Sequence, residues 1–127
     1  MKHITTHPGF FTTYEETKSW LDSMYIENYT ISDDLLVSVD GDVEIAFSNL
    51  YYIPVQFSYI GGHFICHDNM LENLQGLENL TKIGGNFHCY TNNLTSLRGL
   101  ENLTEVGDFD CSDNNQKLVI LIVQITI

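Results

Sequence analysis

Residues 83–89 read Ile-Gly-Gly-Asn-Phe-His-Cys, and residues 60–66 read Ile-Gly-Gly-His-Phe-Ile-Cys. A third copy, one residue shorter, reads Val-Gly-Asp-Phe-Asp-Cys at 106–111. The first two copies are 83 − 60 = 23 residues apart, and Phe87 and Phe109 are 22 apart. Between copies the chain reads Gly-Leu-Glu-Asn-Leu-Thr at 76–81 and again at 99–104. This fixed period predicts stacked structural units rather than an ordinary globular fold.

Each unit has an aromatic residue, a cysteine, an asparagine and two leucines at one spacing. These are Phe64, Cys66, Asn69, Leu71 and Leu74 in one copy and Phe87, Cys89, Asn92, Leu94 and Leu97 in the next. Alternate side chains of a strand share a side, so we expect the aromatic residue and the cysteine to point inward. We also expect the asparagine amides to bond backbone groups where the chain leaves each strand, forming a ladder that includes Asn114. The Gly-Gly pairs are interpreted as turn residues with backbone angles denied to other residues.

This pattern resembles the leucine-rich repeat, in which a short strand is followed by an asparagine and spaced leucines. The chain is similar to the short, cysteine-containing leucine-rich repeat proteins of bacteria and their phages over about residues 36–116. The resemblance implies an α/β repeat fold, a leucine-rich repeat solenoid with a short parallel β-sheet on its concave face. One departure is that Ile60 and Ile83 precede the strand phenylalanine by four positions, whereas the usual spacing is three.

A weaker copy lies upstream, where residues 39–45 align with residues 60–66 at an offset of 21. Ser48 stands where the other copies have asparagine, and Pro54 marks a different turn. We therefore predict three regions. Residues 1–36 form an N-terminal cap with one helix, residues 37–116 form about four leucine-rich repeats, and residues 117–127 form an apolar C-terminal strand or cap.

The N-terminal helix is predicted from Thr13-Tyr14-Glu15-Glu16, which is a capping-box pattern. The helix should run to about Tyr25, with Tyr14, Trp20, Leu21 and Met24 on its apolar face. We interpret it as the cover of the first unit. A separate partner-binding helix is the alternative.

The C-terminal residues 117–127 are almost wholly apolar and β-branched, which favours a strand. Such a strand could be a divergent last coil that covers the final unit. It could also be an exposed edge that pairs with a second copy and gives a homodimer through residues 118–127. Both interpretations remain open.

Composition limits the class of partner. Acidic residues outnumber lysine and arginine by 17 to 5, which gives a net charge of −12. This balance disfavours direct binding to nucleic acid or an anionic membrane and favours a basic protein surface. No stretch is long enough to span a bilayer, and no apolar run of a signal peptide follows residues 1–6. Three inward-facing cysteines suggest a reducing compartment, so we expect a cytoplasmic protein.

The outward strand positions should line the concave face, which is where leucine-rich repeat proteins usually bind partners. That face is predicted to be acidic at both ends, with histidine and tyrosine in the middle. Its side chains are not needed for the core, so their identity is free to serve recognition. The predicted partner-binding residues are Asp42, Glu44, His63, Ile65, His67, Asn86, His88, Tyr90, Asp108 and Asp110.

Catalytic and metal-binding chemistry is not expected. Cys66 and Cys89 each precede or follow a histidine, but adjacent strand residues point to opposite sides, so a joint zinc site or nucleophilic pair would fail. We therefore predict no cofactor, no metal and no enzyme activity. The leading hypothesis is a protein–protein interaction module with an acidic face, a small phage or bacterial inhibitor of a nucleic-acid-binding protein. The alternative is a structural protein that self-associates through its C-terminal strand.

Overall fold

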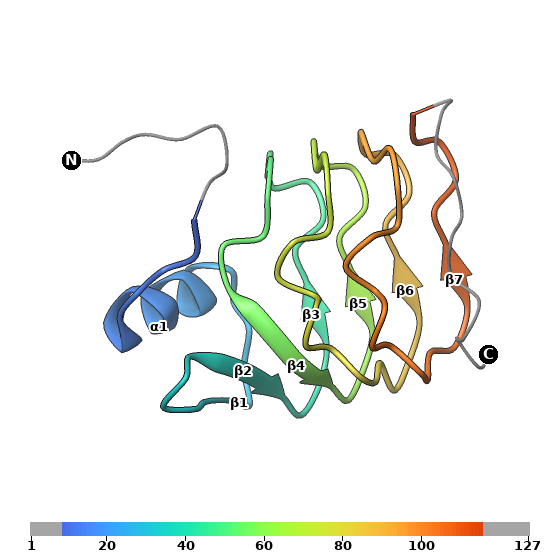
Figure 1. The fold of residues 1–127 in the computed structure, drawn as a ribbon. Coiled ribbons are helices and arrows are strands. Elements are labelled where there is room, and N and C mark those ends of the chain that lie inside the picture. Colours follow the sequence, from blue (N-terminus) through green and yellow to red (C-terminus); the bar gives the residue numbers. More distant parts are fainter. Residues whose placement is uncertain (1–8, 116–127) are drawn as a thin grey trace.

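The structure is a computed structural model that describes residues 9–115. Within these residues the chain forms one helix and seven strands (Figure 1). The elements are α1 (Tyr14–Ser23), β1 (Tyr29–Ile31), β2 (Leu36–Val39), β3 (Val43–Glu44), β4 (Gln56–Ile60), β5 (Phe64–Ile65), β6 (Phe87–His88) and β7 (Phe109–Asp110). The helix α1 lies at the end of the molecule that carries β1, β2 and β4.

The predicted fold class, a leucine-rich repeat solenoid with one short parallel sheet, is wrong. The protein is a small α/β fold in which the described residues form two sheets, a mixed one of order β1-β2-β4 and a parallel one of order β3-β5-β6-β7. The mixed sheet arises because β1 folds back antiparallel onto β2, while β4 lies parallel to β2 on its other side. In β2 and β4, Val37, Val39 and Phe57 are buried and Ser38 and Ser58 are more exposed, the alternation of a strand with one buried face. The prediction of a single sheet did not include the strands β2 and β4, which precede the parallel strands β3 and β5 in the first two copies.

The strands of the parallel sheet pair at the spacing of the sequence motif. Val43 is the partner of Phe64, Phe64 of Phe87, and Phe87 of Phe109. The phenylalanines therefore stack, with ring centroids 5.1 Å apart between Phe64 and Phe87 and 5.4 Å apart between Phe87 and Phe109. Phe64 and Phe87 are fully buried and form the centre of the core. The inward orientation predicted for the strand phenylalanines is confirmed for these two.

The predicted asparagine ladder is confirmed. Asn92 accepts a hydrogen bond from the Leu71 N–H at 2.9 Å and donates from Nδ2 to the carbonyls of Cys66 and Cys89, both at 3.1 Å. Asn69 and Asn114 make the same kinds of contact one unit earlier and one unit later. Each side chain thus joins two successive turns of the chain and satisfies backbone groups that burial would otherwise leave unpaired.

The role predicted for the Gly-Gly pairs is wrong. The described glycines with positive φ are Gly76 and Gly99, which lie outside the pairs. In the pairs, glycine is required because successive corners of the chain lie in direct backbone contact. A Cβ on Gly84 would overlap with the carbonyl oxygen of Gly61.

The helix begins as predicted and ends earlier. Thr13 has extended backbone angles and its Oγ1 accepts the Glu16 N–H at 3.1 Å, so the N-cap is confirmed. The Glu16 carboxylate accepts the N–H of Thr12, one residue before the cap. The helix stops at Ser23 because Tyr25 adopts a left-handed conformation with φ of 60°. Of the predicted apolar face, Leu21 is fully buried and Trp20 and Met24 pack against the core, whereas Tyr14 is exposed.

Within residues 9–115, α1 falls short of the length and apolarity that a membrane-crossing helix requires. The C-terminal strand predicted at 117–127, and the homodimer predicted through 118–127, lie outside the described residues.

Candidate interaction surface

The predicted partner-binding residues lie along the strands of the parallel sheet, at the corners that lead into them, and, for His67 and Tyr90, just beyond the strand ends. Glu44, Ile65, His88 and Asp110 form one row across β3, β5, β6 and β7, because they are successive Cα partners. Of the ten residues, Asp42, Glu44, His63 and Asp108 are exposed and the other six are half-buried. The fold therefore brings the predicted set to one side of the parallel sheet.

Four residues directly precede β3, β5, β6 and β7, and hydrogen bonds join each of them to the next. The Asp42 carboxylate accepts the His63 N–H at 2.8 Å, His63 Nδ1 accepts the Asn86 N–H at 2.9 Å, and Asn86 Oδ1 accepts the Asp108 N–H at 3.0 Å. An Nδ1 that accepts a hydrogen bond places the imidazole proton on Nε2. These hydrogen bonds lie at the surface, and through them Asp42, His63 and Asn86 each fix the corner that leads into the next strand.

Aromatic rings gather at the other end of the strands. His67 and Tyr90 stack with centroids 4.3 Å apart and an interplanar angle of 5°. His88 lies 5.8 Å from Tyr90, and Phe47 meets the edge of His67 at 5.4 Å. We call Phe47, His67, His88 and Tyr90 the aromatic cluster. His67 is held in place by a 2.7 Å contact between its Nδ1 and the carboxylate of Asp68.

Phe47 was not among the predicted residues and is the most unusual member of the cluster. Its side chain is 73% exposed, and its backbone is left-handed with φ of 55°. The equivalent positions hold Asp68, Thr91 and Asp113, all left-handed as well. A left-handed backbone favours asparagine, aspartate or glycine and is costly for a bulky residue. A bulky aromatic residue where other copies have short polar ones was the signal in the sequence.

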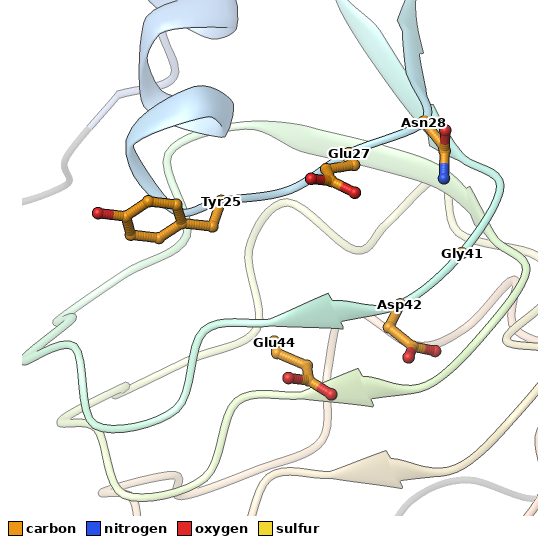
Figure 2. A pocket seen from close by; sticks show the side chains of 6 residues that line it. All are labelled: Tyr25, Glu27, Asn28, Gly41, Asp42 and Glu44. Carbon is orange, nitrogen blue, oxygen red and sulfur yellow. The ribbon is translucent and has the colours of Figure 1, made fainter.

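An acidic hollow adjoins β3 at the end of the parallel sheet. It has a volume of about 380 Å³, and Figure 2 shows its lining. The lining residues are Tyr25, Glu27, Asn28, Gly41, Asp42 and Glu44. Tyr25 is 91% exposed and, like Phe47, left-handed. Tyr25, Glu27 and Asn28 come from the segment between α1 and β1, and they were not predicted because only folding brings that segment beside β3.

The opposite end of the face is also acidic. The Asp110 carboxylate accepts hydrogen bonds from the Ser112 N–H at 3.0 Å and from the Ser112 hydroxyl at 2.7 Å. The bond from the Ser112 backbone, followed by that from its hydroxyl, lowers the pKa of Asp110 below its usual value. Asp110 is therefore ionised at neutral pH and adds to the negative charge beside Asp108.

The cysteines differ in access, and this gives a testable expectation. Burial raises the pKa of Cys66 and Cys89 well above the usual value, so both are neutral thiols at physiological pH. Cys111 is half-buried, and burial raises its pKa as well. We expect iodoacetamide to modify Cys111 slowly in the native protein, and Cys66 and Cys89 only after urea unfolding. Peptide mass spectrometry over a labelling time course measures this, and equal rates at Cys66 and Cys111 would contradict the buried core position.

Within residues 9–115, no three histidine, cysteine, aspartate or glutamate side chains are grouped so as to hold a metal ion. The expected absence of a metal, a cofactor and enzyme activity stays a prediction. No family model matches this chain, and no curated protein and no solved structure is significantly similar to it. The geometry of the surface is therefore the basis for a functional proposal.

Proposed function

We propose that the protein is a non-enzymatic interaction module that binds a partner protein through the outward side of its parallel sheet. The observation that supports this most is the aromatic cluster, and Phe47 within it. An exposed phenylalanine in a left-handed turn disfavours folding for two reasons: its backbone is strained, and its apolar ring is exposed to water. An exposed residue that lowers the stability of the fold is a candidate for a binding role, because folding alone does not account for it.

Aromatic residues provide much of the binding energy at protein interfaces, because they bury large areas with little loss of side-chain entropy. In the cluster, the stack of His67 on Tyr90 holds both rings in one arrangement before any partner arrives. Phe47 then offers an apolar contact beside this rigid platform. Preorganised contacts of this kind lose less free energy on binding than mobile ones.

Carboxylates flank the aromatic cluster and indicate the charge of the partner. Glu44 and Asp42 lie on the β3 side, and Asp108 and Asp110 lie on the β7 side. With a net charge of −12, the chain attracts basic proteins and repels nucleic acid and anionic membranes. We infer a partner with a basic surface. A nucleic-acid-binding protein is the natural member of that class, and inhibition would follow if the carboxylates took the places of phosphates.

The substitution Phe47→Asn separates binding from folding. Asparagine tolerates the left-handed backbone, so we expect the free energy of unfolding to stay the same or rise by about 1 kcal/mol. Binding should fall sharply, since the apolar contact is lost. The measurement is urea unfolding together with affinity capture from lysate and quantitative mass spectrometry. Tyr51→Asn is the matched control, because Tyr51 is an exposed aromatic residue outside the cluster.

The capture experiment is read by differences between variants. A protein retained by the wild type and by Tyr51→Asn, but lost with Phe47→Asn and with Tyr90→Ala, would support binding at the aromatic cluster. Its retention should weaken as salt rises if carboxylates attract it. If the wild type and all three variants retained the same proteins, the proposal would be contradicted.

A further inference from the structure

The two sheets differ at the end of the molecule near α1. In the mixed sheet, β1 pairs with β2 and extends the sheet by one strand. In the parallel sheet, β3 is the edge strand, and within residues 9–115 only β5 pairs with it. At this end, the segment from Tyr25 to Asn28 lines the hollow beside β3. Near β3, the Asn28 carbonyl of this segment accepts the N–H of Asp40. The parallel sheet therefore ends in an open edge.

The backbone groups of β3 show which atoms are free. The N–H groups of Val43 and Ile45 donate to the carbonyls of His63 and Ile65, both at 2.8 Å. Neighbouring residues of a strand direct their backbone groups to opposite sides, so the N–H and carbonyl of Glu44 point away from β5. Within the described part of the chain these two groups have no backbone partner. They are a donor and an acceptor ready for another strand.

The acidic hollow lies on this open side. Figure 2 shows Glu44 on β3, Asp42 just before it, and Tyr25 and Glu27 across from them, on the segment that follows α1. The hollow's lining thus has three carboxylates and, within residues 9–115, no lysine, arginine or histidine. A strand laid beside β3 would bring its own side chains next to these carboxylates, where cationic side chains are favoured. The exposed ring of Tyr25 can also contact a cation through its face.

We propose that the open edge of β3 binds an extended, basic segment of the partner protein. The segment adds to the parallel sheet beside β3, pairs with the backbone of Glu44 and places a lysine or arginine side chain in the acidic hollow. This rests on the proposed function, because the same partner contacts the aromatic cluster. Backbone pairing provides affinity in such strand addition, and side-chain pockets provide specificity.

The charge on the edge explains why the occupant is a basic strand and not a second copy of this chain. Edge strands invite pairing between identical molecules, and charged side chains on the edge prevent it. Asp42 and Glu44 provide that protection here, and the net charge of −12 strengthens it. The same carboxylates that repel another copy attract a strand that carries lysine or arginine.

Synthetic peptides test this directly. The probe is an acetylated, amidated hexapeptide that alternates lysine and valine, and the readout is the ¹H–¹⁵N correlation spectrum of the labelled full chain. We expect shifts at the amides of Glu44, Ala46 and Asn28. A peptide methylated at alternate backbone nitrogens keeps the charge but cannot pair, and it should bind about tenfold more weakly or worse. Glutamate in place of lysine should abolish binding.

Two variants locate the site. Gly41 lines the hollow, and a Cβ there would have only Asn28 Nδ2 near it, at 3.8 Å, so Gly41→Leu should fill space without disturbing the fold. We expect it to weaken binding of the lysine-valine peptide about tenfold. Glu44→Gln should weaken binding as well. Glu72→Gln is its control, because it removes the same charge from an exposed residue outside the hollow and should leave binding unchanged.

Three outcomes would overturn the inference: equal binding of the methylated peptide, shifts confined to residues away from β3, or tighter binding of a peptide with the sequence of residues 118–127. The partner found by capture separates this inference from the proposed function. A partner lost with Phe47→Asn but kept in full by Gly41→Leu would leave the proposed function standing and refute the edge. A partner lost with Gly41→Leu and kept by Phe47→Asn and Tyr90→Ala would support the edge and refute the aromatic cluster.

Discussion

Asn92→Ala should lower the free energy of unfolding by about 4 kcal/mol, the largest effect that we expect from one side chain. Asn92 is 7% exposed, and it bonds the Leu71 N–H and the carbonyls of Cys66 and Cys89. Alanine would leave the buried Leu71 N–H without its partner, and the carbonyls of Cys66 and Cys89 would each keep only one side-chain hydrogen bond, from Asn69 and Asn114 respectively. A buried unpaired backbone group costs about 1–3 kcal/mol, and each of the two other lost hydrogen bonds costs about 1 kcal/mol, which together give the expected loss of about 4 kcal/mol.

Urea unfolding followed by circular dichroism measures this loss. Asn93→Ala is the matched control, since Asn93 is the exposed neighbour, and it should change the free energy of unfolding by less than about 0.5 kcal/mol. Asn114→Ala should fall between the two, because Asn114 is only partly buried. Equal effects at Asn92 and Asn93 would show that the asparagine ladder does not stabilise the fold.

Gly84→Ala should destabilise the protein by about 3 kcal/mol, although it adds a single methyl group. The new Cβ would overlap with the Gly61 carbonyl oxygen and lie 2.9 Å from the Gly61 carbonyl carbon. Both are backbone atoms, so no side-chain rotation can relieve the contact. The corner at residues 60–62 and the corner at residues 83–85 would have to separate, and the hydrogen bond from the Gly84 N–H to the Ile60 carbonyl would lengthen.

Gly41→Ala is the comparison that isolates the cause. Gly41 does not have a positive φ, and the nearest atom to its Cβ would be Asn28 Nδ2 at 3.8 Å. Alanine there should leave stability unchanged or raise it by about 0.5 kcal/mol, because the unfolded chain loses conformational freedom. Thermal or urea unfolding of both variants decides the point. Similar losses at the two positions would indicate a backbone-angle requirement instead of close packing.

The motif spacing was sufficient to predict how the parallel sheet pairs. Phe64 and Phe87 occupy equivalent positions, and a shift of one residue would turn both rings out of the core. The asparagine contacts were predictable for a related reason, since an asparagine just after a buried strand lies beside the backbone groups that leave it. These are local relations, repeated along the chain, and each copy supports the same interpretation.

The candidate surface was predictable only in part. The row of Glu44, Ile65, His88 and Asp110 follows from strand alternation, and the structure places it as a row. The structural role of His63 did not follow, because it depends on the exact distance between its ring and the next corner. Phe47 was not among the predicted residues, because its exposure depends on a left-handed backbone that the apolar pattern does not reveal.

The sequence by itself determined which residues face inward, which strands of the parallel sheet are neighbours, and where asparagine joins successive turns. All three follow from the repeat period, which can be read directly from the amino-acid sequence. Only the tertiary structure decided that β1, β2 and β4 form a second, mixed sheet, because the antiparallel pairing of Tyr29 with Val39 competes with other pairings of similar local propensity. That choice takes β1 to β2 and leaves β3 at an open edge, beside an acidic hollow built from two separate segments. Contacts between distant segments depend on the packing of the whole chain, so local patterns do not reveal them.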